Sequence, residues 1–184
     1  MYLHEDKEVF IATIMDASKR WKLPITIVEK DYYVTMILKL LAVQLDNCVF
    51  KGGTSLSKGY HLLNRFSEDI DITFTEHIGE ARRKKLKHIV LKGISDTLHM
   101  PILNWDNIQS DRDYNQYIFG YQSIAKDGQG KLYPGVKLET ALASYAFPTE
   151  KREIDSYVRQ LLQEKMQRLL KNIIFRLYLC KFNL

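Results

Sequence analysis

Hydrophobic residues recur at the spacing of an α-helix in two segments near the N-terminus. The first segment covers residues 4–22 and is predicted to form one helix. Pro24 interrupts the pattern, and residues 26–29 have the form of a capping box, in which the Thr26 hydroxyl and the Glu29 carboxylate each accept from a backbone N–H group. We therefore expect a second helix that runs from this point to about Leu45.

The pattern then alternates between strands and helices. Residues 47–50 are apolar apart from Asn47 and lead into Gly52 and Gly53, as expected for a buried strand that enters a turn. Residues 69–74 alternate strictly between polar and apolar, which predicts a strand with one buried face. Further strands are predicted over 117–121 and 136–140, with a turn at 126–130. Helices are predicted over 56–64, capped by Thr54 or Ser55, over 80–98, and from residue 154 onward.

This order of elements predicts an α+β fold in which helices flank a small mixed β-sheet. We expect a core over residues 1–150 and a C-terminal helical segment over residues 151–184. At 184 residues, the chain has the length of one domain.

Composition and charge narrow the function classes only slightly. The net charge of +5 and the pI of about 9.1 suit a protein that meets nucleotides or RNA, although many proteins without such partners share this balance. The charged N-terminus lacks the apolar run of a signal peptide, and no apolar stretch is long enough to span a bilayer. Cys48 and Cys180 form neither a zinc pattern nor a disulfide framework. We expect a cytoplasmic protein with free thiols and no membrane partner.

The glycine turn after the first predicted strand carries the first candidate chemistry. Glycines allow the backbone to approach a ligand closely, and the free N–H groups at the start of the following helix favour phosphate. Ser55 and Lys58 would add a hydroxyl and a positive charge to this cradle.

Two carboxylates follow on the next predicted strand. Asp69 and Asp71 are two positions apart, so both side chains should leave the same face and repel unless a cation lies between them. Mg²⁺ is the natural cation, because it takes oxygen ligands from one or two carboxylates and from phosphates. Glu139, on another alternating strand, is the best candidate for a third carboxylate. Each feature alone also fits an ordinary turn, a solvated strand face or a surface glutamate, and their order along the chain is what favours a site.

These motifs resemble those of a known family. An apolar strand, Gly-Gly-Thr, a helix and then Asp-apolar-Asp-apolar resembles the signature of the DNA polymerase β-like nucleotidyltransferases. More narrowly, residues 28–34 (Val-Glu-Lys-Asp-Tyr-Tyr-Val), 50–56 (Phe-Lys-Gly-Gly-Thr-Ser-Leu) and 65–71 (Arg-Phe-Ser-Glu-Asp-Ile-Asp) resemble the AbiEii family. That family contains the toxins of type IV toxin–antitoxin and abortive-infection systems. The resemblance is specific over residues 20–75 and loose over residues 76–150.

The resemblance implies an Mg²⁺-dependent enzyme that transfers a nucleotide from an NTP to an acceptor. GTP or a pyrimidine NTP would be the donor, tRNA the acceptor, and an antitoxin the partner. The metal would be bound by Asp69, Asp71 and Glu139, and the last of these would also activate the acceptor hydroxyl. Arg65 would brace the motif or touch phosphate. The triphosphate would be held by Gly52, Gly53, Thr54, Ser55 and Lys58.

The length of the chain departs from this resemblance. Full members of the family continue for roughly another hundred residues, through a helical region that helps to build the nucleotide pocket, so the C-terminal helix resembles the start of a truncated region. The alternative is therefore a catalytically inactive remnant that binds nucleotide or a partner without turnover. A basic RNA-binding module is a third possibility, because residues 82–92 form a dense basic helix face that is either simply solvated or contacts tRNA phosphates.

Overall fold

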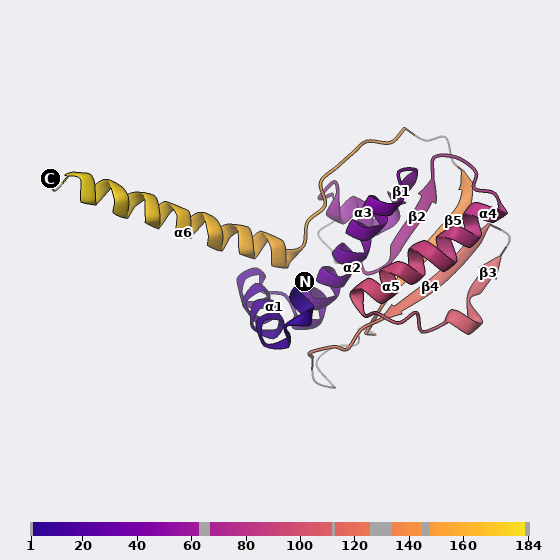
Figure 1. The fold of residues 1–184 in the computed structure, drawn as a ribbon, viewed down its shortest axis with the longest axis horizontal. Coiled ribbons are helices and arrows are strands. Elements are labelled where there is room, and N and C mark those ends of the chain that lie inside the picture. Colours follow the sequence, from indigo (N-terminus) through magenta and orange to yellow (C-terminus); the bar gives the residue numbers. More distant parts are fainter. Residues whose placement is uncertain (1, 63–66, 112, 126–133, 145–147, 183–184) are drawn as a thin grey trace.

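The computed structural model describes residues 2–62, 67–111, 113–125, 134–144 and 148–182, with side chains described as far as Leu169 except at positions 110, 143 and 144. A five-stranded sheet in the order β1-β2-β5-β4-β3 forms the centre of the fold (Figure 1). β2 and β5 are parallel and the other neighbours are antiparallel, so the sheet is mixed. The strands are β1 (Cys48–Lys51), β2 (Ile70–Phe74), β3 (Gln109–Asp111), β4 (Tyr114–Gly120) and β5 (Gly135–Ser144).

Helices precede, interrupt and follow the strands. The long N-terminal helices are α1 (Lys7–Trp21) and α2 (Ile25–Gln44), and the short α3 (Gly52–Lys58) follows β1 directly. The predicted helix over residues 80–98 is continuous but changes winding, as α4 (Glu80–Lys85), a π-helical stretch η2 (Leu86–Leu91) and α5 (Lys92–Leu98). Two 3₁₀ turns, η1 (Leu3–Glu5) and η3 (Trp105–Asn107), and the C-terminal α6 (Tyr157–Phe182) complete the fold. The predicted α+β class with a small mixed sheet is confirmed.

One face of the sheet is covered by helices and holds the core. Ile70, Ile72 and Phe74 of β2 are at most 1% exposed and belong to the same apolar cluster as residues of α2, η2 and α5. Because side chains alternate along a strand, Asp71 lies on the opposite face and stays half-buried. The alternation predicted for this strand is therefore confirmed, and it divides the sheet into an apolar face and a polar face.

Two predicted helix starts are wrong. α2 begins at Ile25 with Pro24 at its N-cap and no side-chain cap, so residues 26–29 do not form a capping box. Glu29 instead accepts hydrogen bonds from Ser123 and from the backbone of Ile124. The next helix starts at Gly52 rather than at residue 56, and Lys51 caps it without a side-chain hydrogen bond. In both places, contacts distant in sequence replace the predicted local caps.

The last helix extends from the body of the protein (Figure 1). Its first turns lie against α1, where Arg20 Nε is 3.0 Å from Glu164 Oε2 and Lys165 Nζ is 2.6 Å from Asp16 Oδ2. The boundary at residue 150 stays a prediction, as does the turn at 126–130, which lies outside the described residues. Among the residues that the structure describes, no helix is both long enough and apolar enough to cross a membrane.

Candidate functional site

The parallel pairing of β2 and β5 brings two predicted site residues together. Asp71 and Glu139 are direct neighbours in the register of these strands, and both lie on the polar face of the sheet. On the next strand, Gln116 is paired with Glu139 and its Nε2 donates a 3.3 Å hydrogen bond to Glu139 Oε1. Asp71 and Glu139 are 68 positions apart in the sequence, and their carboxylates thus lie on the same surface of the sheet.

Lys137 joins the remaining carboxylate to this surface. Its Nζ is 3.0 Å from Asp69 Oδ2 and 3.1 Å from Glu139 Oε1, so one ammonium group bridges the loop before β2 and strand β5. Asp69 itself lies one residue before β2 begins, and not within the strand as predicted. Lys137 was not among the predicted site residues, although its place two positions before Glu139 on an alternating strand puts both on one face.

The carboxylates differ in their electrostatic surroundings. Burial, together with the neighbouring Glu139 and Asp69, raises the pKa of Asp71 above its ordinary value. Burial also acts to raise the pKa of Glu139, but hydrogen bonds from Lys137 and Tyr114 outweigh it and lower that pKa. The hydrogen bond to Asp69 is the largest cause of a raised pKa at Lys137. The site therefore gathers negative charge that Lys137 and, beside Asp71, Lys51 of β1 balance only in part.

The glycine turn lies directly against Asp71. Gly52 has a φ of +74°, a conformation that favours glycine, and an added Cβ would stand 2.1 Å from Asp71 Oδ2. The backbone can approach the carboxylate this closely only because the side chain is absent. The turn and the β2 carboxylate thus form one continuous surface, as the sequence predicted.

The hydroxyls after the glycines are engaged within the protein. Thr54 is fully buried, where its hydroxyl lies 2.7 Å from the Ser67 hydroxyl and donates to the carbonyl oxygen of Asp69. Ser55 donates a 2.8 Å hydrogen bond to the carbonyl oxygen of Gly52. Thr54 therefore fixes the segment that carries Asp69, and Ser55 closes the glycine turn.

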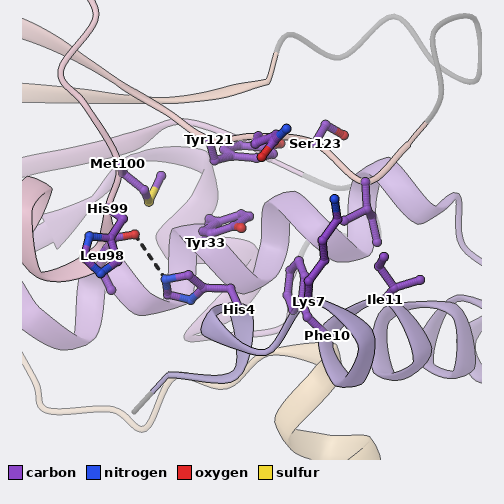
Figure 2. A pocket seen from close by; sticks show the side chains of 12 residues that line it. His4, Lys7, Phe10, Ile11, Tyr33, Leu98, His99, Met100, Tyr121 and Ser123 are labelled. Carbon is purple, nitrogen blue, oxygen red and sulfur yellow. Dashed lines mark hydrogen bonds between the residues drawn. The ribbon is translucent and has the colours of Figure 1, made fainter.

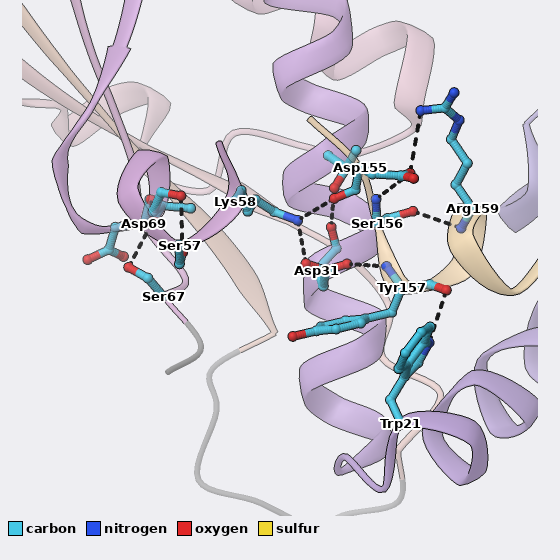
Figure 3. A network of polar contacts seen from close by, with 12 residues as sticks. Trp21, Asp31, Ser57, Lys58, Ser67, Asp69, Asp155, Ser156, Tyr157 and Arg159 are labelled. Carbon is cyan, nitrogen blue, oxygen red and sulfur yellow. Dashed lines mark hydrogen bonds and ion pairs between the residues drawn. The ribbon is translucent and has the colours of Figure 1, made fainter. Parts of the chain in front are cut away.

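Lys58 lies away from the carboxylates, at the C-terminal end of α3. Its ammonium forms an ion pair with Asp31 of α2 and donates a 3.0 Å hydrogen bond to the carbonyl oxygen of Asp155 (Figure 3). Its side chain is only 9% exposed, so it has little freedom to meet a phosphate. Arg65, the other predicted cation, lies outside the described residues.

Three consecutive charged residues of α2 are buried, and each has a partner in a different segment. Glu29 accepts from Ser123 and Ile124, Lys30 pairs with Glu68, and Asp31 pairs with Lys58. Asp31 also accepts a 3.0 Å hydrogen bond from the backbone N–H of Tyr157. These contacts explain why charged residues occupy the buried positions of a helix, since each charge is paired and ties a distant segment of the chain to α2.

The donor set suits Mg²⁺, but its geometry is not that of a metal centre. Three carboxylates beside a glycine turn offer the oxygen ligands that Mg²⁺ takes, and an ammonium already sits between two of them. Within the described residues, no group of three His, Cys, Asp or Glu side chains has an arrangement that could hold an ion. The residues therefore fit the ion by the chemistry of their oxygen donors, while the ammonium of Lys137 lies between Asp69 and Glu139.

An aromatic cavity of about 310 Å³ opens on the helix-covered side of the fold (Figure 2). Its wall includes Tyr33 and Tyr121, which stack with their ring centroids 4.3 Å apart, and His4, which lies 2.9 Å from the Tyr32 hydroxyl and 3.1 Å from the Leu98 carbonyl oxygen. None of the predicted site residues lines this cavity.

The basic helix face borders a second groove, of about 340 Å³. Lys87 Nζ lies 5.1 Å from the centre of the Trp105 ring, while Arg82 and Lys84 form ion pairs with nearby glutamates. Asn115 lines this groove, and the neighbouring Gln116 contacts Glu139, so the groove and the carboxylates lie on opposite faces of the sheet. The contact with tRNA phosphates stays a prediction.

A mixed sheet with a glycine turn against Asp71, which follows Asp69 at the start of β2, is the arrangement expected of a nucleotidyltransferase-type α+β domain. The family model described as "Nucleotidyl transferase AbiEii toxin, Type IV TA system" matches residues 39–171, which is more than half of the chain. The chain therefore belongs to the AbiEii family of nucleotidyltransferase toxins of type IV toxin–antitoxin systems, and the sequence-based resemblance is confirmed.

One solved structure is also similar. It is the crystal structure of a proposed nucleotidyltransferase from H. pylori, with 28% sequence identity and a TM-score of 0.42. The similarity covers 64% of this chain and 45% of that one, so the chain spans less than half of the protein it matches. No curated protein matches the sequence.

Proposed function

We propose that this chain transfers a nucleotide from an Mg²⁺-bound NTP to an RNA acceptor, with tRNA as the expected acceptor. Family membership supports the reaction class, since the family model describes nucleotidyl transferase toxins. The observation that carries the proposal is the contact between the Gly52 turn and Asp71, with Glu139 beside it on β5. A triphosphate on this turn would lie next to the carboxylates that bind its metal.

The residues of the chain have distinct roles in this proposal. Asp69, Asp71 and Glu139 would hold Mg²⁺, which would neutralise charge on the triphosphate and polarise its phosphoryl oxygens. Gly52 and Gly53 would bring backbone N–H groups close to the phosphates. Thr54 and Ser55 would keep the turn and Asp69 in position through the hydrogen bonds described above.

The reaction needs one bond to form and one to break. The acceptor hydroxyl oxygen would bond to the α-phosphorus while the bond from this phosphorus to the bridging oxygen of the β-phosphate breaks, which releases pyrophosphate. Glu139 would orient the hydroxyl and take its proton, because a carboxylate beside the reacting oxygen is ionised at neutral pH and can accept it. Gln116 holds that carboxylate in place through its 3.3 Å hydrogen bond.

Lys58 receives a different role from the one that its position in the sequence suggests. We assign it to positioning, because its buried ion pair with Asp31 and its bond to the Asp155 carbonyl fix the end of α3 against α2. The expected donor remains GTP or a pyrimidine NTP, and the expected protein partner an antitoxin.

The proposal can be tested with purified protein, total tRNA, Mg²⁺ and each of the four labelled NTPs. We expect label to appear on tRNA with at least one NTP, and the double variant D69N/D71N to remove that transfer. Unchanged transfer by the double variant would exclude the carboxylates as the metal site. Calorimetry with non-hydrolysable NTP analogues addresses the alternative, because binding by the wild type without any transfer indicates an inactive nucleotide-binding remnant.

A further inference from the structure

Lys137 occupies the position between two candidate metal ligands. Its Nζ contacts Asp69 Oδ2 at 3.0 Å and Glu139 Oε1 at 3.1 Å, and these two side chains come from different segments. The lysine side chain is 36% exposed, so its flexible stem can leave this place without disrupting the core. Lys137 is thus an internal counter-ion that solvent can reach.

A divalent cation and an ammonium group cannot share this place, because two positive charges a few ångströms apart repel each other. The ammonium also offsets the repulsion between the carboxylates that face it. A free metal ion must therefore displace Lys137 and leave its charge without a partner. A metal ion that binds together with a triphosphate is accompanied by negatively charged phosphate oxygens. The displaced ammonium of Lys137 can pair with these oxygens.

We propose that Lys137 makes metal binding depend on nucleotide, by holding Asp69 and Glu139 until an Mg²⁺–NTP complex displaces its ammonium toward the triphosphate. This inference deepens the proposed function, on which it rests. It assigns Lys137 as a residue that selects the metal–nucleotide complex over the free metal. In thermodynamic terms, Lys137 creates a coupling free energy between the metal and the nucleotide.

The test measures Mn²⁺ binding by electron paramagnetic resonance, without and with the α,β-methylene analogues of GTP and CTP, which cannot transfer a nucleotide. In the wild type, we expect an analogue to tighten Mn²⁺ binding by about tenfold, within the usual range of such coupling. In K137M, which keeps the length of the stem but lacks the charge, free Mn²⁺ should bind more tightly than in the wild type. The effect of the analogue should then shrink to less than about half of its wild-type value on a free-energy scale.

Three further variants separate the effect of the charge at Lys137 from the effect of its exact position and from general effects of removing a lysine. K137R keeps a positive charge and should retain part of the coupling, whereas K137Q should behave as K137M does. K39M removes one charge from an exposed lysine of α2 and should match the wild type. Circular dichroism and melting curves establish that each variant is folded before its metal binding is compared.

The outcomes distinguish this inference from the proposed function. If the wild type binds Mn²⁺ and an analogue but K137M and K137Q show the same affinities and the same coupling as the wild type, the role of Lys137 is wrong and the transferase proposal stands. If the wild type binds neither Mn²⁺ nor an analogue, both proposals fail. Tighter free Mn²⁺ in K137M together with reduced coupling supports the inference whether or not transfer is observed.

Discussion

The carboxylate of Asp31 accepts a 3.0 Å hydrogen bond from the backbone N–H of Tyr157, a residue 126 positions later in the chain. Asp31 lies in the second turn of α2, and Tyr157 is the first residue of α6. The same carboxylate pairs with Lys58 at the end of α3, so one buried group joins three helices (Figure 3). Burial raises the pKa of Asp31, while the charge of Lys58 opposes that rise.

The Asp31–Lys58 pair should be important for stability. Removing one partner of a buried ion pair leaves an uncompensated charge, so we expect K58M to lower the free energy of unfolding by about 3–5 kcal/mol, and D31N by a similar amount. The double variant should lose less than the sum of the two. Urea unfolding measures all three, with R20Q, which breaks an exposed pair, expected to lower the free energy of unfolding far less than K58M does. If K58M is as stable as the wild type but binds nucleotide weakly, Lys58 contacts phosphate and its positioning role is wrong.

Gly52 should not tolerate a side chain. An alanine Cβ would meet the Asp71 carboxylate at 2.1 Å and would also have to adopt a φ of +74°. We expect G52A to abolish nucleotide transfer and to lower the free energy of unfolding by more than about 1 kcal/mol.

Gly93 offers a matched control for that substitution. It lies within α5, and an added Cβ there has nothing within 4 Å. G93A should keep transfer and raise the free energy of unfolding by up to about 1 kcal/mol, since alanine is the better helix former. Equal activity and equal stability of G52A and G93A would show that the turn does not approach Asp71 as described.

His4 should make stability depend on pH near neutrality. Burial lowers the pKa of His4 below 6.5, and its ring contacts the Tyr32 hydroxyl and the Leu98 carbonyl. The unfolded chain therefore binds a proton at a higher pH than the folded chain does, so the free energy of unfolding falls as pH drops below 6.5. Above that pH, the contribution of His4 is fully present.

The variant H4Q isolates this effect from other titrating groups. Burial raises the pKa of Glu29, so that carboxyl makes an opposite contribution as the solution becomes acidic. The free energies of unfolding of the wild type and H4Q can be measured with urea at pH 7.5 and 5.5. Lowering the pH should reduce the free energy of unfolding of the wild type more than that of H4Q. If the difference in unfolding free energy between the wild type and H4Q does not change with pH, His4 has the same pKa in the folded and unfolded chains.

Local sequence patterns predicted those parts of the fold that do not depend on contacts with segments distant in sequence. The alternation in residues 69–74 gave β2 and its buried face, because one apolar and one polar side are a property of the strand itself. The turn at Gly52 and its nearness to Asp71 also followed from their order along the chain. Glu139 could be placed on a strand but not beside Asp71, since register is a long-range property.

The errors arose where a distant segment decides the contact. The predicted cap at Thr26 and Glu29 is absent, because the Glu29 carboxylate accepts hydrogen bonds from Ser123 and from the backbone N–H of Ile124 instead. Lys58 follows the glycine turn closely in sequence, but α3 is short and its last residue faces Asp31 instead. Lys137 could have been found, because it shares a strand face with Glu139.

The most direct test of the account is single-turnover transfer of labelled nucleotide to tRNA by D71N, compared with the control D96N. Both variants remove one carboxylate charge, but Asp96 lies on the exposed surface of α5, in an ion pair with Lys92. We predict that D96N transfers at the wild-type rate and that D71N, although folded, shows at least a hundredfold slower transfer, as is typical when a catalytic electrostatic group is lost. Transfer by D71N at the wild-type rate would contradict the assignment of the site.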